Sequence, residues 1–257
     1  MTDRVFPLSG VHNFRRFGAY EGADGRSVRD TLYRSGQFSR ATDDDHAVLD
    51  GLNVKVVADL RRPSEREAEP SHWPGREGVT VIESDHAGPA EAPHLRFLRE
   101  EDLTFDSIRR FMTETYRRLP FDEGNQHVFR EGVKALAEAG DEDGFIVHCA
   151  AGKDRTGIFC ALVLWEAGVD HDTVVEDYLM TNTAVDFDRI AGAMRERLSQ
   201  KYGREFRDAE LRAFLGVDGD YLDAALEVMG DPSRYLRDEL GLSEDVLARL
   251  RDRLLTG

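Results

Sequence analysis

The sequence predicts an α/β protein, in which a parallel-sheet core is flanked by helices and followed by a C-terminal helical cap. Two observations lead to this prediction. Short runs of β-branched and apolar residues alternate with segments of helical pattern up to residue 170. Beyond that point the pattern is almost entirely helical. We therefore expect one domain over residues 1–257, with an α/β core (1–170) and a helical C-terminal part (171–257).

Three apolar runs predict the strands of the sheet. They are bounded by turn residues and rich in Val and Ile, which is typical of buried parallel strands. In chain order they are VKVVADL (54–60), VTVIESD (79–85) and FIVHCA (145–150).

The helices are predicted from their ends as well as from their periodicity. Thr42 is a suitable N-cap for residues 43–52, and Gly140 closes a helix over residues 125–140. Another helix is expected from about Asp102 to Leu119. The later helices are divided by breaks near Gly203 and at residues 216–219, 230–232 and 241–243. The stretch HAGPAEAPH (86–94) is expected to be a mobile loop.

Composition limits the classes of partner. A formal net charge of -16 argues against nucleic acid and anionic membranes, because both are held by clustered Lys and Arg. No run approaches the ~18 apolar residues of a membrane span, and the first residues lack a signal-peptide pattern. We expect a cytoplasmic protein without stable membrane insertion, and leave open its export without a recognisable signal peptide. The oligomeric state is not predicted.

The motif HCAAGKDRTG (148–157) carries the chemistry. A predicted strand leads into His148 and Cys149, a short loop follows, and a helix is expected from about Thr156 to Ala167, with Gly168 past its end. Loop N–H groups and a helix N-terminus that converge on one point favour a phosphate or another oxyanion. The same field favours the thiolate form of Cys149. Arg155 can return to the loop and hold two phosphate oxygens with its planar fork.

Other functions of this loop fit less well. A nucleotide-binding loop needs Ser or Thr after the lysine and an earlier glycine, whereas Asp154 follows Lys153 here. A zinc site lacks partners, because the chain has only two cysteines, Cys149 and Cys160. An ordinary charged turn would bury Lys153, Asp154 and Arg155 at high cost without a task for them.

The motif resembles the signature loop of the cysteine-dependent protein tyrosine phosphatases, and most closely that of their bacterial atypical branch. The resemblance extends over nearly the whole chain. Supporting segments are NFRRFGAY (13–20), LYRSGQFS (32–39), VADLRRPSE (57–65), DYLMTN (177–182) and YLRDELGLSEDVLARLRDRLL (235–255). The family more often has N-F-R-D-x-G-G in the first of these, so Arg16 and Ala19 depart from its pattern.

The resemblance implies a role for each residue of the loop. Cys149 would be the nucleophile that forms a phosphocysteine, while Arg155 and the loop N–H groups would hold the phosphate oxygens. Thr156 would hydrogen-bond the thiolate, and His148 would order the loop. No metal or other cofactor is implied. The residues expected to bind phosphate or substrate are Ala150, Ala151, Gly152, Lys153, Thr156 and Asp59.

Three aspartates are candidates for the acid that protonates the leaving group. Asp154 ranks first, because related phosphatases of this branch carry an aspartate at the same place in the loop. Asp59 ends a predicted parallel strand and could face the site, or could pair with Arg61 or Arg62. Asp122, in LPFDEG, is more typical of an exposed turn. The WPG segment at residues 73–75 resembles the acid loop of eukaryotic members, but Gly75 has no carboxylate.

The substrate class stays open at this stage. The resemblance favours phosphotyrosine proteins, and Lys153 favours phosphoinositides as well, since lipid phosphatases with the same C-x2-G-K start use this lysine on ring phosphates. A phosphoinositide-specific phosphatase, a phospho-binding module without turnover and a sulfurtransferase are the alternatives. The last two would be separated from a phosphatase by assays of phosphate and thiocyanate release.

Overall fold

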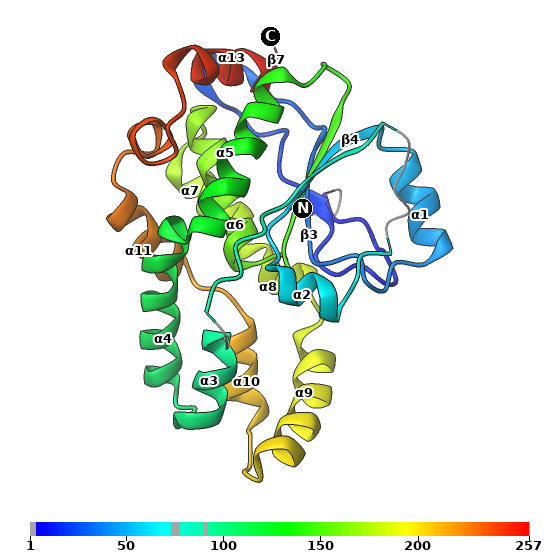
Figure 1. The fold of residues 1–257 in the computed structure, drawn as a ribbon, viewed down its shortest axis with the longest axis vertical. Coiled ribbons are helices and arrows are strands. Elements are labelled where there is room, and N and C mark those ends of the chain that lie inside the picture. Colours follow the sequence, from blue (N-terminus) through cyan, green and yellow to red (C-terminus); the bar gives the residue numbers. More distant parts are fainter. Residues whose placement is uncertain (1–3, 73–77, 90–91, 257) are drawn as a thin grey trace.

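The computed structural model describes residues 4–72, 78–89 and 92–256. A five-stranded sheet lies at its centre (Figure 1), and all of its pairs are parallel except that of the short edge strand β1 with β3. The predicted fold class is therefore confirmed. In spatial order the strands are β1 (Arg15–Arg16), β3 (Leu32–Ser35), β6 (Gly144–His148), β4 (Val54–Asp59) and β5 (Thr80–Ile82), and β2 (Ser27–Val28) pairs separately with β7 (Leu255–Thr256).

Helices cover the sheet and fill the C-terminal part (Figure 1). Within the first 170 residues they are α1 (Asp43–Asp50), α2 (Pro63–Ala68), α3 (Pro93–Glu100), α4 (Phe105–Arg118), α5 (Glu123–Glu138) and α6 (Asp154–Glu166). The later helices are α7 (His171–Leu179), α8 (Thr181–Ala184), α9 (Phe187–Tyr202), α10 (Asp208–Leu215), α11 (Gly219–Met229), α12 (Pro232–Arg234) and α13 (Glu244–Leu254). The predicted breaks between the later helices are thus confirmed.

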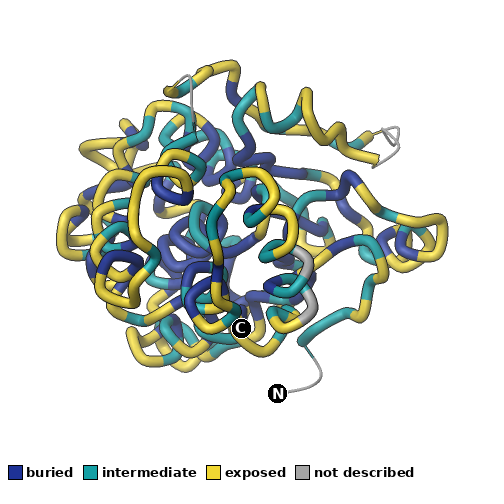
Figure 2. The backbone as a smooth tube through the Cα atoms, turned by 90° about the horizontal axis from the view of Figure 1, so that it is seen from below, coloured by how far each residue is buried: buried dark blue, intermediate teal, exposed yellow. Residues whose placement is uncertain are grey.

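Strand β6 lies in the middle of the sheet and divides the core into two parts. Phe145 and Val147 join the larger core, which includes residues of α5 and α6, whereas Ile146 joins a smaller core with Leu49 of α1. All five residues of β6 are buried, as a central parallel strand requires. Figure 2 shows the buried chain gathered in the interior, with the exposed chain on the outer helices and turns. The carboxyl end of β6 is therefore held rigidly from both faces.

Local signals placed several elements correctly. Thr42 caps α1 through a capping box with Asp45, as its sequence predicts. Helix α6 begins at Asp154, two residues before the predicted start, and Gly168 follows its end with a φ of 79°.

Other elements differ from the predictions. Strand β5 is an edge strand rather than a buried one, and Val81 is 54% exposed. Strand β3 and helices α2 and α3 were not predicted, and α3 begins at Pro93, inside the stretch expected to be a loop. Residues 90–91 of that stretch lie outside the described residues.

The C-terminal helices reach the α/β part of the chain at several points. Helices α10 and α11 pack against α4, α7 packs against α6, and α13 packs against α5. In Figure 1, α3, α4, α9 and α10 form the end of the molecule opposite α13. No helix in the described part of the chain is long and apolar enough to span a bilayer.

Candidate active site

The loop after β6 turns sharply around the Cys149 sulfur. Gly152 has a φ of 69°, and a Cβ there would lie 2.2 Å from the carbonyl oxygen of Ser35, so only glycine fits. This conformation aims the Gly152 N–H at Cys149 Sγ, 3.2 Å away. Cys149 itself is buried. The loop thus places a backbone donor directly against the sulfur.

The carbonyl groups of the loop are bound by the surrounding protein. The Gln37 N–H donates to the Ala150 carbonyl at 3.1 Å, and Asn13 Nδ2 donates to the Gly152 carbonyl at 2.8 Å. The C=O and N–H of a trans peptide point in opposite directions. The N–H groups of Ala151 and Lys153, which share these two peptides, therefore point away from those partners. This arrangement leaves loop N–H groups available to an anion.

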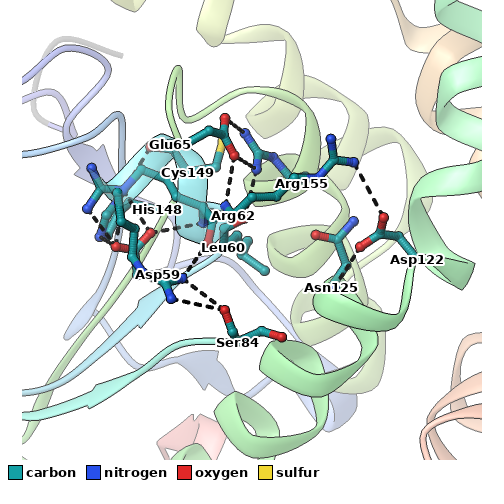
Figure 3. Close-up of polar contacts among 12 residues, drawn as sticks. Asp59, Leu60, Arg62, Glu65, Ser84, Asp122, Asn125, His148, Cys149 and Arg155 are labelled. Carbon is teal, nitrogen blue, oxygen red and sulfur yellow. Dashed lines mark hydrogen bonds and ion pairs between the residues drawn. The ribbon is translucent and has the colours of Figure 1, made fainter. Parts of the chain in front are cut away.

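Arg155 is held in place by Glu65 of α2 (Figure 3). Its Nη1 donates to Glu65 Oε2 at 2.6 Å and to the Leu60 carbonyl at 2.8 Å, and its Nη2 donates to Glu65 Oε1 at 2.8 Å. Guanidinium carries five N–H groups. Within the described residues, Nε–H and the second Nη2–H have no hydrogen-bond partner, and they form one edge of the fork. That edge matches two oxygens of a phosphate.

Neighbouring charges keep both Arg155 and Glu65 ionised. Burial alone would lower the pKa of Arg155, but Cys149 and Glu65 raise it above its ordinary value. Burial would likewise raise the pKa of Glu65, but the hydrogen bonds and charge of Arg155 lower it. The Arg155 guanidinium is therefore a fixed cation beside the thiol.

Lys153 and Asp154 have partners outside the loop. Lys153 Nζ donates to the carbonyls of Phe214 at 3.0 Å and Gly216 at 3.3 Å, at the C-terminal end of α10. Asp154 Oδ1 accepts from the Tyr116 hydroxyl at 2.7 Å and lies 3.5 Å from Lys153 Nζ. The Asp154 side chain remains 24% exposed.

Thr156 follows in the first turn of α6. Its hydroxyl is buried and has no hydrogen-bond partner among the described residues. A buried hydroxyl without a partner is free to donate, and its hydrogen bond to the Cys149 thiolate stays a prediction.

His148 and Asp59 lie side by side at the ends of β6 and β4 (Figure 3). The Asp59 carboxylate accepts from Arg61 Nε and Nη2, the pairing that the sequence analysis gave as the alternative. Burial would raise the pKa of Asp59, but His148 and Arg61 lower it below its ordinary value. His148 Nδ1 lies 3.4 Å from the Cys149 carbonyl, and burial lowers the pKa of its imidazole. A loop-ordering role for His148 fits this placement, and substrate binding by Asp59 stays a prediction.

Asp122, the third acid candidate, has its partners outside the loop. Asp122 is the N-cap of α5, where Oδ1 accepts from the Asn125 N–H at 3.1 Å and Oδ2 lies 3.5 Å from Arg62 Nη2. Its carboxylate already serves the helix end. The WPG segment at residues 73–75 lies outside the described residues.

Several residues around the loop were not predicted individually. Each nevertheless belongs to a segment that carried the family resemblance, so those segments were the available signal. They are Asn13 and Arg15 in NFRRFGAY, Arg34 in LYRSGQFS, Glu65 in VADLRRPSE, and Asp177 and Tyr178 in DYLMTN. Tyr116 lies in none of these segments, so no signal in the sequence pointed to its role.

A thiol at the end of a parallel strand, loop amides around it and an arginine held alongside are typical of a cysteine-dependent phosphatase. The comparisons with known proteins agree. A model of the tyrosine phosphatase family matches residues 6–256. The chain therefore belongs to the tyrosine phosphatase family.

Curated relatives cover most of the chain. The triple specificity protein phosphatase PtpB of Mycobacterium tuberculosis is 34% identical, over 98% of this chain and 99% of the relative. A putative tyrosine-protein phosphatase of Cupriavidus necator is 31% identical, over 96% of this chain and 87% of the relative. A tyrosine-protein phosphatase of Nostoc commune is 27% identical, over 88% and 74% respectively. The resemblance given by the sequence motifs is confirmed.

Proposed function

We propose that this phosphatase hydrolyses phosphotyrosine in proteins and, with the help of Lys153, phosphoinositides, through a phosphocysteine at Cys149. The observation that supports the mechanism best is the geometry at the sulfur. The Gly152 N–H reaches Cys149 Sγ at 3.2 Å, and the free edge of Arg155 is fixed beside it by Glu65. Both groups would stabilise negative charge on the thiolate and on the phosphate.

The first step transfers the phosphoryl group to sulfur. The Cys149 thiolate attacks phosphorus, and the P–S bond forms as the P–O bond of the ester breaks. Arg155 and the loop N–H groups hold the equatorial oxygens. Asp154 gives its proton to the departing oxygen, which leaves as the phenol or alcohol.

The second step regenerates the enzyme. A water molecule attacks phosphorus, the P–S bond breaks, and Cys149 leaves as the thiolate. The water proton passes to the Asp154 carboxylate, which is again an acid for the next turnover. The Thr156 hydroxyl would stabilise the departing thiolate by a hydrogen bond.

The substrate class is proposed from the loop and from the relatives. One relative is named as a triple specificity phosphatase and two as tyrosine-protein phosphatases. Lys153 adds an ammonium beside the loop, which suits a ring that carries more than one phosphate. The carbonyls of Phe214 and Gly216 now hold this ammonium, and a multiply phosphorylated substrate would have to displace them.

The test combines a substrate screen with removal of the nucleophile. Phosphate release should be measured over phosphotyrosine peptides and phosphoinositides, and both should be hydrolysed by the unaltered protein. Cys149→Ser should lose essentially all turnover while it still binds phosphorylated ligand, because the loop N–H groups and Arg155 remain. Substantial residual hydrolysis would exclude the phosphocysteine mechanism. Binding without turnover by the unaltered protein would instead identify a phospho-binding module.

A single-domain organisation and a cytoplasmic location are part of the same proposal. The contacts of α7, α11 and α13 with α6, α4 and α5 support one folding unit over residues 1–257. One cooperative unfolding transition of the full chain would support it.

A further inference from the structure

A chain of hydroxyl groups leads from the interior of the protein to the side chain of Asp154. The Tyr116 hydroxyl, from α4, lies 2.7 Å from Asp154 Oδ1. The Tyr178 hydroxyl, from α7, lies 2.5 Å from the Tyr116 hydroxyl. We propose that Tyr116, supported by Tyr178, is a positioning residue that selects which oxygen of Asp154 delivers the proton to the leaving group. This inference rests on the proposed function, because it takes Asp154 as the acid.

The direction of these hydrogen bonds follows from the number of protons. A carboxylate oxygen only accepts, and a phenol has a single proton to donate. Tyr116 therefore donates to Asp154 Oδ1, and Tyr178 donates to the Tyr116 oxygen. Burial raises the pKa of both phenols well above the ordinary value, and the nearby Asp154 raises it further. Both phenols keep their protons at neutral pH, so the direction of the chain does not change.

The consequence concerns the two oxygens of Asp154. Oδ1 accepts from Tyr116 and lies 3.5 Å from the Lys153 ammonium, so both neighbours disfavour a proton on that oxygen. In the acid form the Lys153 ammonium still disfavours a proton on Oδ1, so this arrangement favours the proton on Oδ2. The side chain is partly exposed, in the first turn of α6, and would otherwise be free to exchange its two oxygens by rotation. The Tyr116 hydrogen bond removes that freedom.

This restraint matters because proton transfer depends steeply on geometry. A misplacement of about 1 Å can cost on the order of 10²-fold in rate. Tyr116 and Tyr178 are themselves fixed, since they are 0% and 1% exposed and pack edge to face with their ring centroids 6.1 Å apart. The ring of Tyr221, from α11, also packs against Tyr116, with the ring centroids 5.7 Å apart. The donor is thus held by two helices of the C-terminal part.

Tyr116→Phe tests the inference, because it keeps the ring packing and removes only the hydroxyl. Formation of the phosphocysteine should be measured in single turnovers with phenyl phosphate and with p-nitrophenyl phosphate. Phenolate needs the acid, whereas nitrophenolate departs almost unaided. We expect the rate with phenyl phosphate to fall by roughly 10-fold or more, within the range that general-acid catalysis contributes, and the rate with p-nitrophenyl phosphate to fall by less than about 3-fold. Tyr178→Phe should give the same pattern with a smaller loss.

Tyr235→Phe is the matched control. The Tyr235 hydroxyl is also buried and donates to a backbone carbonyl, that of Pro120, just after the C-terminal end of α4. Its removal should change both rates alike, if at all. Equal losses on the two substrates with Tyr116→Phe would show that its hydroxyl serves packing alone, and would overturn the inference.

The variant Asp154→Ala tests the proposed acid separately from the positioning role of Tyr116. If Asp154→Ala slows phenyl phosphate selectively while Tyr116→Phe does not, the acid is correct and the positioning role is wrong. If Asp154→Ala shows no selectivity, the proposed acid is wrong and the inference falls with it. In the double variant, Tyr116→Phe should add little to the loss caused by Asp154→Ala, because both changes act through one proton.

Discussion

The catalytic loop has two sides that are built differently. Its floor is buried and consists of Asn13, Arg15, Arg34 and Asp177. There Arg34 Nη1 donates to Asp177 Oδ2 at 2.9 Å, with side chains 0% and 1% exposed. Its mouth consists of Lys153, Asp154 and Arg155, together with Glu65 and Tyr116. The charged side chains of the mouth are partly exposed. The floor has no atoms to offer a substrate, whereas the mouth does.

The floor acts on the shape of the loop. Asn13 and Arg34 both donate to the Gly152 carbonyl, at 2.8 and 3.2 Å, which turns that carbonyl away from the thiol. Arg34 binds the Asp177 carboxylate, whereas Arg15 Nη2 donates to the Asp177 backbone carbonyl at 3.0 Å. Burial, followed by the charge of Arg34, lowers the pKa of Arg15 to about 9. Changes in the floor should therefore reduce stability more than turnover, and changes in the mouth should do the reverse.

Among changes in the mouth, Asp154→Ala is expected to have the largest effect on the rate of phosphocysteine formation. Proton donation typically contributes ~10²- to 10⁴-fold in rate, and it matters most for poor leaving groups. Single-turnover formation of the phosphocysteine should slow much more with phenyl phosphate or phosphotyrosine than with p-nitrophenyl phosphate. The melting temperature should change little, because the side chain is partly exposed.

Two other aspartates serve as controls for that experiment. Asp122→Ala and Asp59→Asn should affect both substrates alike, since Asp122 caps α5 and Asp59 is bound by Arg61. Asparagine is used at Asp59 because Arg61 would otherwise be left buried with an empty cavity beside it. If either control variant shows leaving-group dependence and Asp154→Ala does not, the general acid is a residue outside the loop.

A smaller effect, also in the mouth, is expected for Lys153→Ala. If the ammonium contacts additional ring phosphates, kcat/KM for multiply phosphorylated inositides should fall much more than for a phosphotyrosine peptide. A charge-assisted hydrogen bond contributes roughly 1.5–3 kcal/mol, which corresponds to about 10- to 150-fold. Equal losses on both substrates would mean that Lys153 only ties the loop to the carbonyls of Phe214 and Gly216.

The floor should respond in the opposite way, and Asn13→Ala tests this. Removal of the amide leaves the Gly152 carbonyl with one donor fewer and takes an acceptor from Arg15 Nη1. A buried polar group left unsatisfied costs about 1–3 kcal/mol, so the free energy of unfolding should fall by about that amount. The change in kcat should stay within several-fold, as measured on p-nitrophenyl phosphate at a temperature well below the transition. A loss of kcat as large as that of Asp154→Ala, with unchanged stability, would contradict the distinction between floor and mouth.

The mouth and the floor also differ in how far the sequence predicted them. Strand β6, the loop and α6 are contiguous, so the run FIVHCAAGKDRTG was enough to place Cys149 and Arg155. The hydrogen bond from the Gly152 N–H to Cys149 Sγ is local, and local geometry follows from local sequence. The Glu65 partner of Arg155 is 90 residues away, so that contact could not be predicted in the same way.

The floor depends on contacts that sequence patterns do not reveal. Strand β3 was missed because its residues Arg34 and Ser35 are polar, yet both are fully buried. The burial of Arg34 is tolerated only because Asp177, 143 residues away, neutralises it. Tyr116 meets Asp154 across 38 residues for the same kind of reason. Pairing of buried polar groups depends on the tertiary structure, so neither the periodicity nor the composition of the sequence predicts it.

The smallest effect is expected at Cys160, the second thiol near the loop. Cys160 is buried within α6, one turn beyond Thr156, and burial raises the pKa of its thiol to about 12, so it stays protonated and unreactive at neutral pH. Cys160→Ser keeps the size of the side chain and adds a hydroxyl that can donate to the carbonyl one turn earlier in the helix. Burial of that hydroxyl should cost about 1–3 kcal/mol of stability. Turnover of p-nitrophenyl phosphate should remain within about twofold, because no atom of the mouth moves, whereas Cys149→Ser should abolish it. A loss of turnover comparable to that of Cys149→Ser, in a variant that still unfolds cooperatively, would show that α6 takes part in catalysis beyond its first turn.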